Sequence, residues 1–173
     1  MEIPPGGHYI SSGLTLLPRH EQAIDQVLSD LRGKVPANLA ILVSRDGQFI
    51  SASGEATRNV DLVALGSLIA GDLAASQRIA ELTGIYEEHQ VILREGAGGH
   101  ILVSDAGSHM VLFVLAPGQV PAGWLRLLGL EAGKLLARIV AAPSGDELPK
   151  DLYLDEKSLA DQFDRALGDL WQG

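Results

Sequence analysis

The stretch Asp61–Leu82, DLVALGSLIAGDLAASQRIAEL, is the most informative part of this sequence. It contains no proline, and Asp61 suits the N-cap position, so it predicts one long helix. A helical wheel gives two apolar faces: Leu62, Leu65, Ile69, Leu73 and Ala80 on the first, and Leu68, Ala75, Ile79 and Leu82 on the second. A helix that covers one face of a sheet needs only one apolar stripe. This helix is therefore expected to be buried on two sides.

Small residues recur along the same helix at a spacing of four. They form two rows, Gly66–Ala70–Ala74 and Ser67–Gly71–Ala75, where another backbone could approach closely. A helix buried inside a single domain is the alternative interpretation. A chain of 173 residues has few elements left to cover a second side, so we favour a surface for self-association and partner binding.

The residues before this helix predict one helix and a hairpin. Pro18–Arg32 begins with a proline, carries an apolar stripe and ends at Gly33, as a helix does. Leu39–Val43 is a continuous apolar run, typical of a strand that is covered on both faces. Asp46–Gly47 is a strong hairpin signal, and Gln48–Ser53 follows as the return strand.

The residues after the long helix predict three strands and a further helix. Short links that contain glycine separate the strands His89–Glu95, His100–Asp105 and His109–Leu115. Pro121 opens a helix with apolar residues at helical spacing. The element order α-β-β-α-β-β-β-α indicates an α+β domain over residues 18–141, with helices packed on a five-stranded antiparallel sheet.

The two ends of the chain differ from this domain in composition. Met1–Leu17 shows no periodicity and is expected to be a flexible arm. Ala142–Leu154 is predicted to be a linker, because proline and glycine occur among charged residues. Asp155–Gly173 is predicted to contain a C-terminal amphipathic helix. The segment after Ala141 holds eight acidic and three basic residues, so its charge is −5 out of −9 for the chain.

Composition and charge exclude several classes of function. The hydrophobic fraction of 46% is enough for a core, and the absence of cysteine excludes disulfides and thiolate chemistry. A net charge of −9 argues against nucleic acid as a partner. The longest purely apolar run, Met110–Ala116, is far shorter than a membrane span, and nothing near Met1 resembles a signal peptide. We therefore expect a cytoplasmic protein without membrane insertion.

No arrangement of residues predicts catalysis, a metal or a cofactor. His89 and His109 are expected at one end of the strand meander and His100 at the other, so they do not converge. The loop Gly96–Gly99 joins two strands instead of opening a helix, which argues against a phosphate-binding loop. No G-x-S-x-G motif is present. The sequence predicts a protein with no catalytic site of its own.

The element order, the Asp46–Gly47 hairpin and the stretch Ala64–Ala75 resemble the roadblock/dynein-light-chain family. Within that family, the resemblance to the bacterial MglB-type proteins is carried by Ala70-Gly71 with Ala74-Ala75, Ile79–Leu82, Glu95–Gly96 and the acidic tail helix. The similarity covers Arg19–Ala141. The sequence departs from the MglB pattern at Asp72, where asparagine is usual, and in its N-terminal arm.

This resemblance implies a roadblock fold, which is profilin- and longin-like, and a homodimer. The second helices would pack together, and the two sheets would join through their third strands. It also implies that each dimer binds one small Ras-like GTPase of the MglA type. MglB-type proteins accelerate GTP hydrolysis by reshaping the switch regions of the GTPase, without an arginine finger, in the control of cell polarity or motility.

The resemblance assigns residues to two surfaces. The surface for dimerisation and GTPase binding comprises Leu65, Gly66, Leu68, Ile69, Ala70, Gly71, Asp72, Ala74, Ala75 and Arg78. A second contact, linked to nucleotide exchange, comprises Leu159, Phe163, Leu167, Leu170 and Trp171 of the tail helix. Arg58 and Arg78, the arginines nearest the second helix in sequence, are expected to be solvent-facing or docking residues.

Two alternative functions stay open from the sequence. One is a roadblock scaffold that recruits a partner without stimulating hydrolysis. The other is a small-molecule sensor, because profilin-like sensors also use a five-stranded antiparallel sheet. A sensor would require a concave pocket lined with polar residues.

Overall fold

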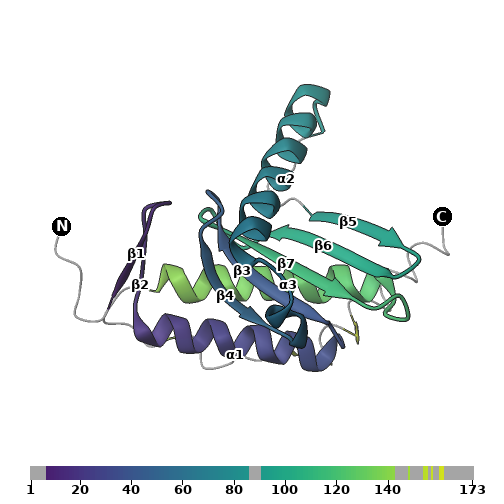
Figure 1. Ribbon diagram of the computed structural model, residues 1–173, viewed down its shortest axis with the longest axis horizontal. Coiled ribbons are helices and arrows are strands. Elements are labelled where there is room, and N and C mark those ends of the chain that lie inside the picture. Colours follow the sequence, from purple (N-terminus) through teal and green to yellow (C-terminus); the bar gives the residue numbers. More distant parts are fainter. Residues whose placement is uncertain are drawn as a thin grey trace.

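The computed structural model describes residues 7–85 and 91–142, together with residues 148, 154, 155, 157, 160 and 161. Within these residues a five-stranded antiparallel sheet lies between two helical layers (Figure 1). Helices α1 (Pro18–Lys34) and α3 (Ala122–Ala141) cover one face of the sheet, and α2 (Leu62–Thr83) lies on the other. The predicted α+β roadblock order is confirmed.

The strands are β3 (Leu39–Ser44), β4 (Phe49–Ser53), β5 (Val91–Gly96), β6 (Gly99–Asp105) and β7 (Met110–Ala116). Their order across the sheet is β4-β3-β7-β6-β5, so β3 and β7 are central. All six residues of β3 are buried, as its continuous apolar run predicted. The edge strands are β4 and β5, so the third strand of the domain has one side without a partner strand among the described residues.

The apolar periodicity of α1 and α3 builds the larger core. Ile24, Val27 and Leu28 of α1 have no exposed surface and pack in one cluster with Leu125 and Leu136 of α3. Sheet residues that point to the same side complete this cluster. The smaller cluster lies under α2, where Ile69 and Leu73 pack against the opposite side of the central strands.

Helix α2 begins at the N-cap that its sequence predicts and ends at Thr83, one residue beyond the predicted Leu82. The Asp61 carboxylate accepts hydrogen bonds from the backbone N–H groups of Val63 and Ala64, at 3.1 and 3.0 Å. The helix ends at Gly84, whose left-handed backbone (φ 73°) is a conformation that glycine adopts readily. A short 3₁₀-helix, η1 (Glu55–Arg58), connects β4 to α2 and was not predicted.

The N-terminal residues differ from the flexible arm that the sequence predicted. Residues 8–16 form a hairpin of β1 (His8–Ile10) and β2 (Leu14–Leu16), with Ile10 and Leu16 each only 3% exposed in the larger core. The Ser11 N–H and hydroxyl also donate to Gln48 Oε1, at 3.1 and 2.9 Å. Sequence periodicity did not reveal this hairpin because each strand is only three residues long.

The segment assigned to a linker contains two residues that pack on the domain. Leu148 is half-buried against the larger core, and Leu154 is 5% exposed within it. The Leu154 N–H donates to the Asp30 carboxylate of α1 at 2.8 Å. The folded domain therefore includes Leu154, which lies beyond the boundary at Ala141 that the sequence predicted.

Candidate functional site

Helix α2 carries an apolar stripe that its own domain does not cover. Leu68, Gly71, Ala75, Ile79 and Leu82, hereafter the open face of α2, recur at helical spacing and are all exposed. Leu68 and Leu82 are each 70% exposed, and Ile79 is 60% exposed. Exposed apolar stripes of this length mark interaction surfaces in soluble proteins.

The structure divides the ten predicted residues of this surface between two sides of the helix. Gly66, Ile69 and Ala70 are buried, and Leu65 and Asp72 are half-buried. Leu68, Gly71, Ala74, Ala75 and Arg78 are exposed. Only the five exposed residues are available to another molecule, because the buried and half-buried residues pack against their own domain.

The two rows of small residues have different neighbours. A Cβ atom at Gly66 would lie 2.7 Å from the carbonyl oxygen of Gly47, so the β3–β4 turn of the same chain makes the predicted close backbone approach. A Cβ atom at Gly71 would meet nothing within 4 Å among the described residues, whereas Ser67, in the same row, lies against Gly47 of the β3–β4 turn. The part of this row from Gly71 to Ala75 is therefore open to a second backbone.

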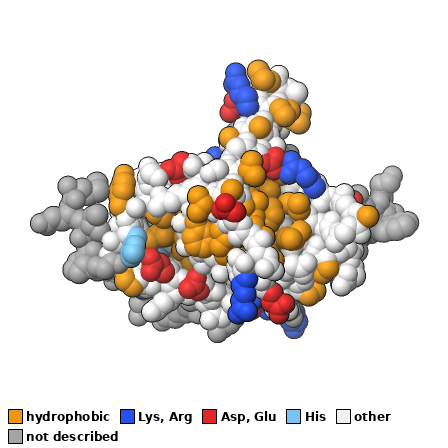
Figure 2. Space-filling view, in the orientation of Figure 1, with side chains coloured by type: hydrophobic (Ala, Val, Ile, Leu, Met, Phe, Trp, Pro, Cys, Tyr) orange, Lys and Arg blue, Asp and Glu red, His pale blue; other side chains and the backbone are white. Residues whose placement is uncertain are grey.

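The sheet face around α2 is also incompletely covered. Ile92, Ile101 and Leu115 pack at the margin of the smaller core and stay half-buried. Figure 2 shows hydrophobic side chains gathered on this face around the base of α2 and again toward the tip of the helix. Exposed apolar side chains thus occur on both the sheet face and the helix.

Asp72 and Arg78 are the two charged residues among the ten predicted residues of this surface. Asp72 forms an ion pair with a strand of the sheet. Its two carboxylate oxygens accept from Nη1 and Nη2 of Arg94 on β5, at 2.5 and 2.6 Å. Hydrogen bonding to Arg94 lowers the pKa of Asp72 below its ordinary value, against a smaller opposing effect of burial. Arg78 pairs at 2.9 Å with Glu81 of the same helix.

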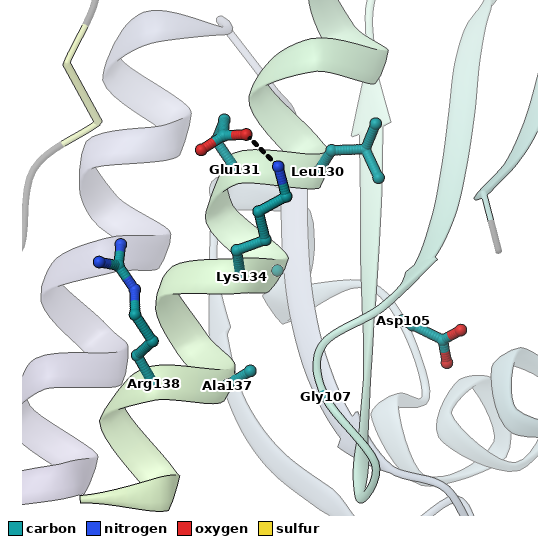
Figure 3. Close-up of a pocket in the computed structure, with 8 residues that line it drawn as sticks. Asp105, Gly107, Leu130, Glu131, Lys134, Ala137 and Arg138 are labelled. Carbon is teal, nitrogen blue, oxygen red and sulfur yellow. Dashed lines mark hydrogen bonds and ion pairs between the residues drawn. The ribbon is translucent and has the colours of Figure 1, made fainter. Parts of the chain in front are cut away.

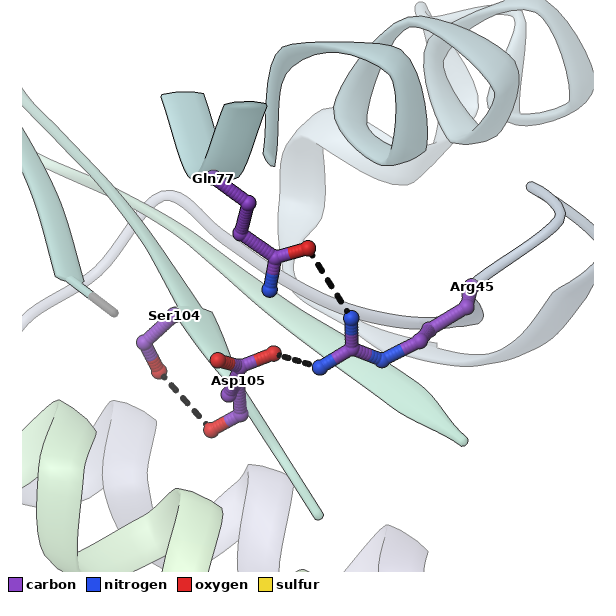
Figure 4. A network of polar contacts seen from close by, with 4 residues as sticks. All are labelled: Arg45, Gln77, Ser104 and Asp105. Atoms are coloured by element: carbon purple, nitrogen blue, oxygen red, sulfur yellow. Dashed lines mark hydrogen bonds and ion pairs between the residues drawn. The ribbon is translucent and has the colours of Figure 1, made fainter. Parts of the chain in front are cut away.

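A second arginine contacts α2 from the other side, and the sequence did not indicate it. Arg45 follows β3; its Nη1 donates to Gln77 Oε1 at 3.1 Å, and its Nη2 donates to Asp105 Oδ1 at the end of β6 (Figure 4). These partners are 32 and 60 residues away in sequence. No local motif could have revealed the contact.

Two grooves lie on the described part of the chain. One groove of about 490 Å³ lies between α3 and the β6–β7 turn, where Lys134 pairs with Glu131 at 2.6 Å (Figure 3). A polar groove of about 570 Å³ lies between the end of α1 and η1. No group of three potential metal ligands occurs among the described residues.

Helix α2 is the one described helix that is long and apolar enough to cross a membrane by length and composition, with a mean hydropathy of 1.2. Only 22% of that apolar window is buried. However, Ile69 and Leu73 pack on the sheet and Asp72 is bound to Arg94. These contacts make α2 a layer of the domain, and they favour a protein partner for its open face.

The predicted contact residues of the tail, Leu159, Phe163, Leu167, Leu170 and Trp171, lie outside the described residues. His89 also lies outside them, whereas His100 and His109 are at opposite ends of the sheet, as predicted.

Comparisons with known proteins give consistent results. The Roadblock/LC7 domain model matches residues 23–116, which is more than half of the chain. The structure is similar to the gliding protein MglB from Thermus thermophilus, with 28% identity and a TM-score of 0.67 over 76% of this chain and 98% of that one. It is also similar to Myxococcus xanthus MglB, with 33% identity and a TM-score of 0.62 over 67% and 93%.

A further solved structure, described as MglB with a tetrameric arrangement, has 26% identity and a TM-score of 0.68 over 76% of this chain and 97% of that one. A search of curated protein sequences found no significant match.

Proposed function

The chain belongs to the Roadblock/LC7 domain family, and from that premise we propose that it is a homodimeric regulator of a small Ras-like GTPase of the MglA type. In this proposal it stimulates GTP hydrolysis without donating an arginine, acts in the cytoplasm, and serves cell polarity or motility. The similarity to MglB structures from Thermus and Myxococcus supports a roadblock-type regulator.

The observation that carries the proposal is the open face of α2. A helix that exposes Leu68, Ile79 and Leu82 at 60–70% leaves an apolar surface that water solvates poorly. Pairing with the same helix of a second copy would bury this stripe symmetrically, and Gly71 would permit close contact. The free edge of β5 could extend the contact by joining the two sheets.

The GTPase would bind across the paired helices, on residues that the dimer leaves exposed. Arg78 lies on that side and is held by Glu81, an arrangement that suits docking rather than insertion into a nucleotide site. The acidic tail would supply a second contact that promotes nucleotide exchange, where its charge would mainly accelerate association.

Dimerisation is tested by light scattering of the full-length chain and of Ala75→Arg. We expect a dimer at low micromolar concentration for the natural sequence and a monomer for Ala75→Arg, because the added charge would lie in the paired stripe. Ala141→Arg is the matched control, since Ala141 is an exposed helical alanine at the end of α3 on the opposite layer. A monomeric natural chain would overturn the proposal.

The GTPase function is tested with MglA-type GTPases from the same organism, loaded with GTP or GDP. We expect binding to the GTP form and faster single-turnover hydrolysis. A true arginine finger contributes about 10³–10⁵-fold, so Arg58→Ala and Arg78→Ala should keep most of the rate at saturating protein. Binding without stimulation would instead support the scaffold function, and loss of stimulation in either variant would refute the arginine-free mechanism.

A further inference from the structure

The C-terminal half of α2 projects away from the sheet (Figure 1). Leu73 is 1% exposed and belongs to the smaller core, but beyond it Ala80 is the only buried residue of the helix. The open face extends through this projecting half to Leu82. Hydrophobic packing therefore fixes the N-terminal half of α2. The direction of the C-terminal half depends on polar contacts.

One polar contact holds the helix from the side of β5. Arg94 binds both carboxylate oxygens of Asp72 in a bidentate ion pair. Asp72 directly precedes Leu73, the last residue of α2 that belongs to the smaller core. A guanidinium that makes two parallel hydrogen bonds constrains orientation as well as distance. Asparagine at position 72 could not accept both bonds, because its nitrogen is a donor.

A second polar contact holds the helix from the opposite flank. Gln77 follows Asp72 by five residues, which places the two side chains about 140° apart around the helix axis. Gln77 accepts from Arg45, and Arg45 is itself held by Asp105 of β6 (Figure 4). Figure 4 shows the Arg45 guanidinium lying between the two acceptors, so it links the helix to the sheet.

We propose that Arg94 and Arg45 are positioning residues that set the angle of the projecting half of α2, and thereby the geometry of the surface offered to the second copy and the GTPase. The effect on partner binding rests on the proposed function, whereas the angle of α2 is a property of a single protomer. From Asp72 to Thr83 the helix extends about 16 Å, so a tilt of about 15° moves its end by about 4 Å. A displacement of that size would misalign side chains that must interdigitate across a paired helix.

Arg94 is expected to affect geometry more than stability. Exposed ion pairs contribute little to folding, with typical values of about 0.2–1 kcal/mol, and the Arg94 and Asp72 side chains are both partly exposed. Removing Arg94 should therefore leave the urea midpoint nearly unchanged, which separates a positioning role from a merely structural one. Arg45 differs because its partner Asp105 is only 5% exposed, so Arg45→Gln is expected to lower the urea midpoint as well.

The test measures the angle of α2 inside one protomer. The chain has no cysteine, so Glu81→Cys on α2 and Arg126→Cys on α3 introduce two unique sites for spin labels. Labelled protein is diluted with an excess of unlabelled protein, and the distance distribution is recorded by pulsed electron resonance. The variants are Arg94→Gln, Arg45→Gln, Asp72→Asn and the exchanged pair Asp72→Arg with Arg94→Asp.

We expect the distribution to be narrow in the natural sequence and to shift or broaden by about 4 Å in Arg94→Gln and Arg45→Gln, with the exchanged pair restoring it. In a GTPase assay the same single variants should need about fivefold more protein for half-maximal stimulation. Unchanged distributions in both glutamine variants would overturn the inference. Since the distance lies within one protomer, this outcome is distinct from failure of dimerisation or of GTPase binding.

Discussion

Leu154 offers the sharpest test of where the folded domain ends. The residue is 5% exposed in the core beneath α1 and α3, and its N–H donates to the Asp30 carboxylate. Replacing a buried leucine by alanine costs about 2–5 kcal/mol. Leu154 lies at the margin of the core, where neighbours can relax, so we expect about 2–3 kcal/mol for Leu154→Ala.

Ending the chain at Pro149 removes the side chain and also its hydrogen bond to a charged group. Such bonds contribute about 1.5–3 kcal/mol, so the expected loss is about 4 kcal/mol. With a urea dependence of about 2 kcal/mol per M, the midpoint should fall by about 1 M for Leu154→Ala and by about 2 M for the truncation.

Urea unfolding at one fixed protein concentration measures these shifts, because dimerisation makes the midpoint depend on concentration. A chain that ends at Asp155 is the matched control, since it loses the tail but keeps Leu154. If truncations at Pro149 and at Asp155 unfold at the same urea concentration, the assignment of Leu154 to the core is refuted. The Asp155 truncation is then also the proper variant for assays of the tail, since it separates partner binding from folding.

Two further predictions concern His20 and the glycines of α2. Burial, followed by the charge of Arg19, lowers the pKa of His20 from its ordinary 6.5, so the unfolded chain takes up this proton before the folded one does. The contribution of His20 to the free energy of unfolding should be fully present above pH 6.5 and be lost as the pH falls below it. His20→Gln should therefore reduce the change in the urea midpoint between about pH 7.5 and about pH 5.5, and an equal change in the variant and the natural sequence would contradict this. Gly66→Ala should destabilise the fold by about 1–3 kcal/mol, because the new Cβ would lie 2.7 Å from the Gly47 oxygen. The new methyl group of Gly71→Ala would meet nothing within 4 Å among the described residues, so this variant should weaken only the dimer in light scattering. Equal losses of thermal stability in Gly66→Ala and Gly71→Ala would refute the different surroundings of the two glycines.

The sequence by itself determined the helices of the domain, the five strands of its sheet, their order along the chain and the two faces of α2, but not the β1–β2 hairpin or η1. Periodicity is a local property, so Leu62–Thr83 could be recognised as a helix with apolar residues on two flanks. The apolar run of β3 likewise predicted a strand that is covered on both faces. These patterns follow from chain geometry and from the hydrophobic effect, and they need no knowledge of distant residues.

Only the tertiary structure decided what lies opposite each face. Both rows of small residues on α2 have a similar composition, yet the β3–β4 turn approaches Gly66 and Ser67, whereas a Cβ atom at Gly71 would meet nothing within 4 Å among the described residues. The contacts of Arg94 with Asp72, Arg45 with Asp105, and Leu154 with Asp30 join residues 22, 60 and 124 positions apart. Such pairs depend on strand order, register and the packing of layers, which helical or strand periodicity does not encode. The physical reason is that periodicity sets the direction in which a side chain points, whereas its partner is set by the packing of the whole domain.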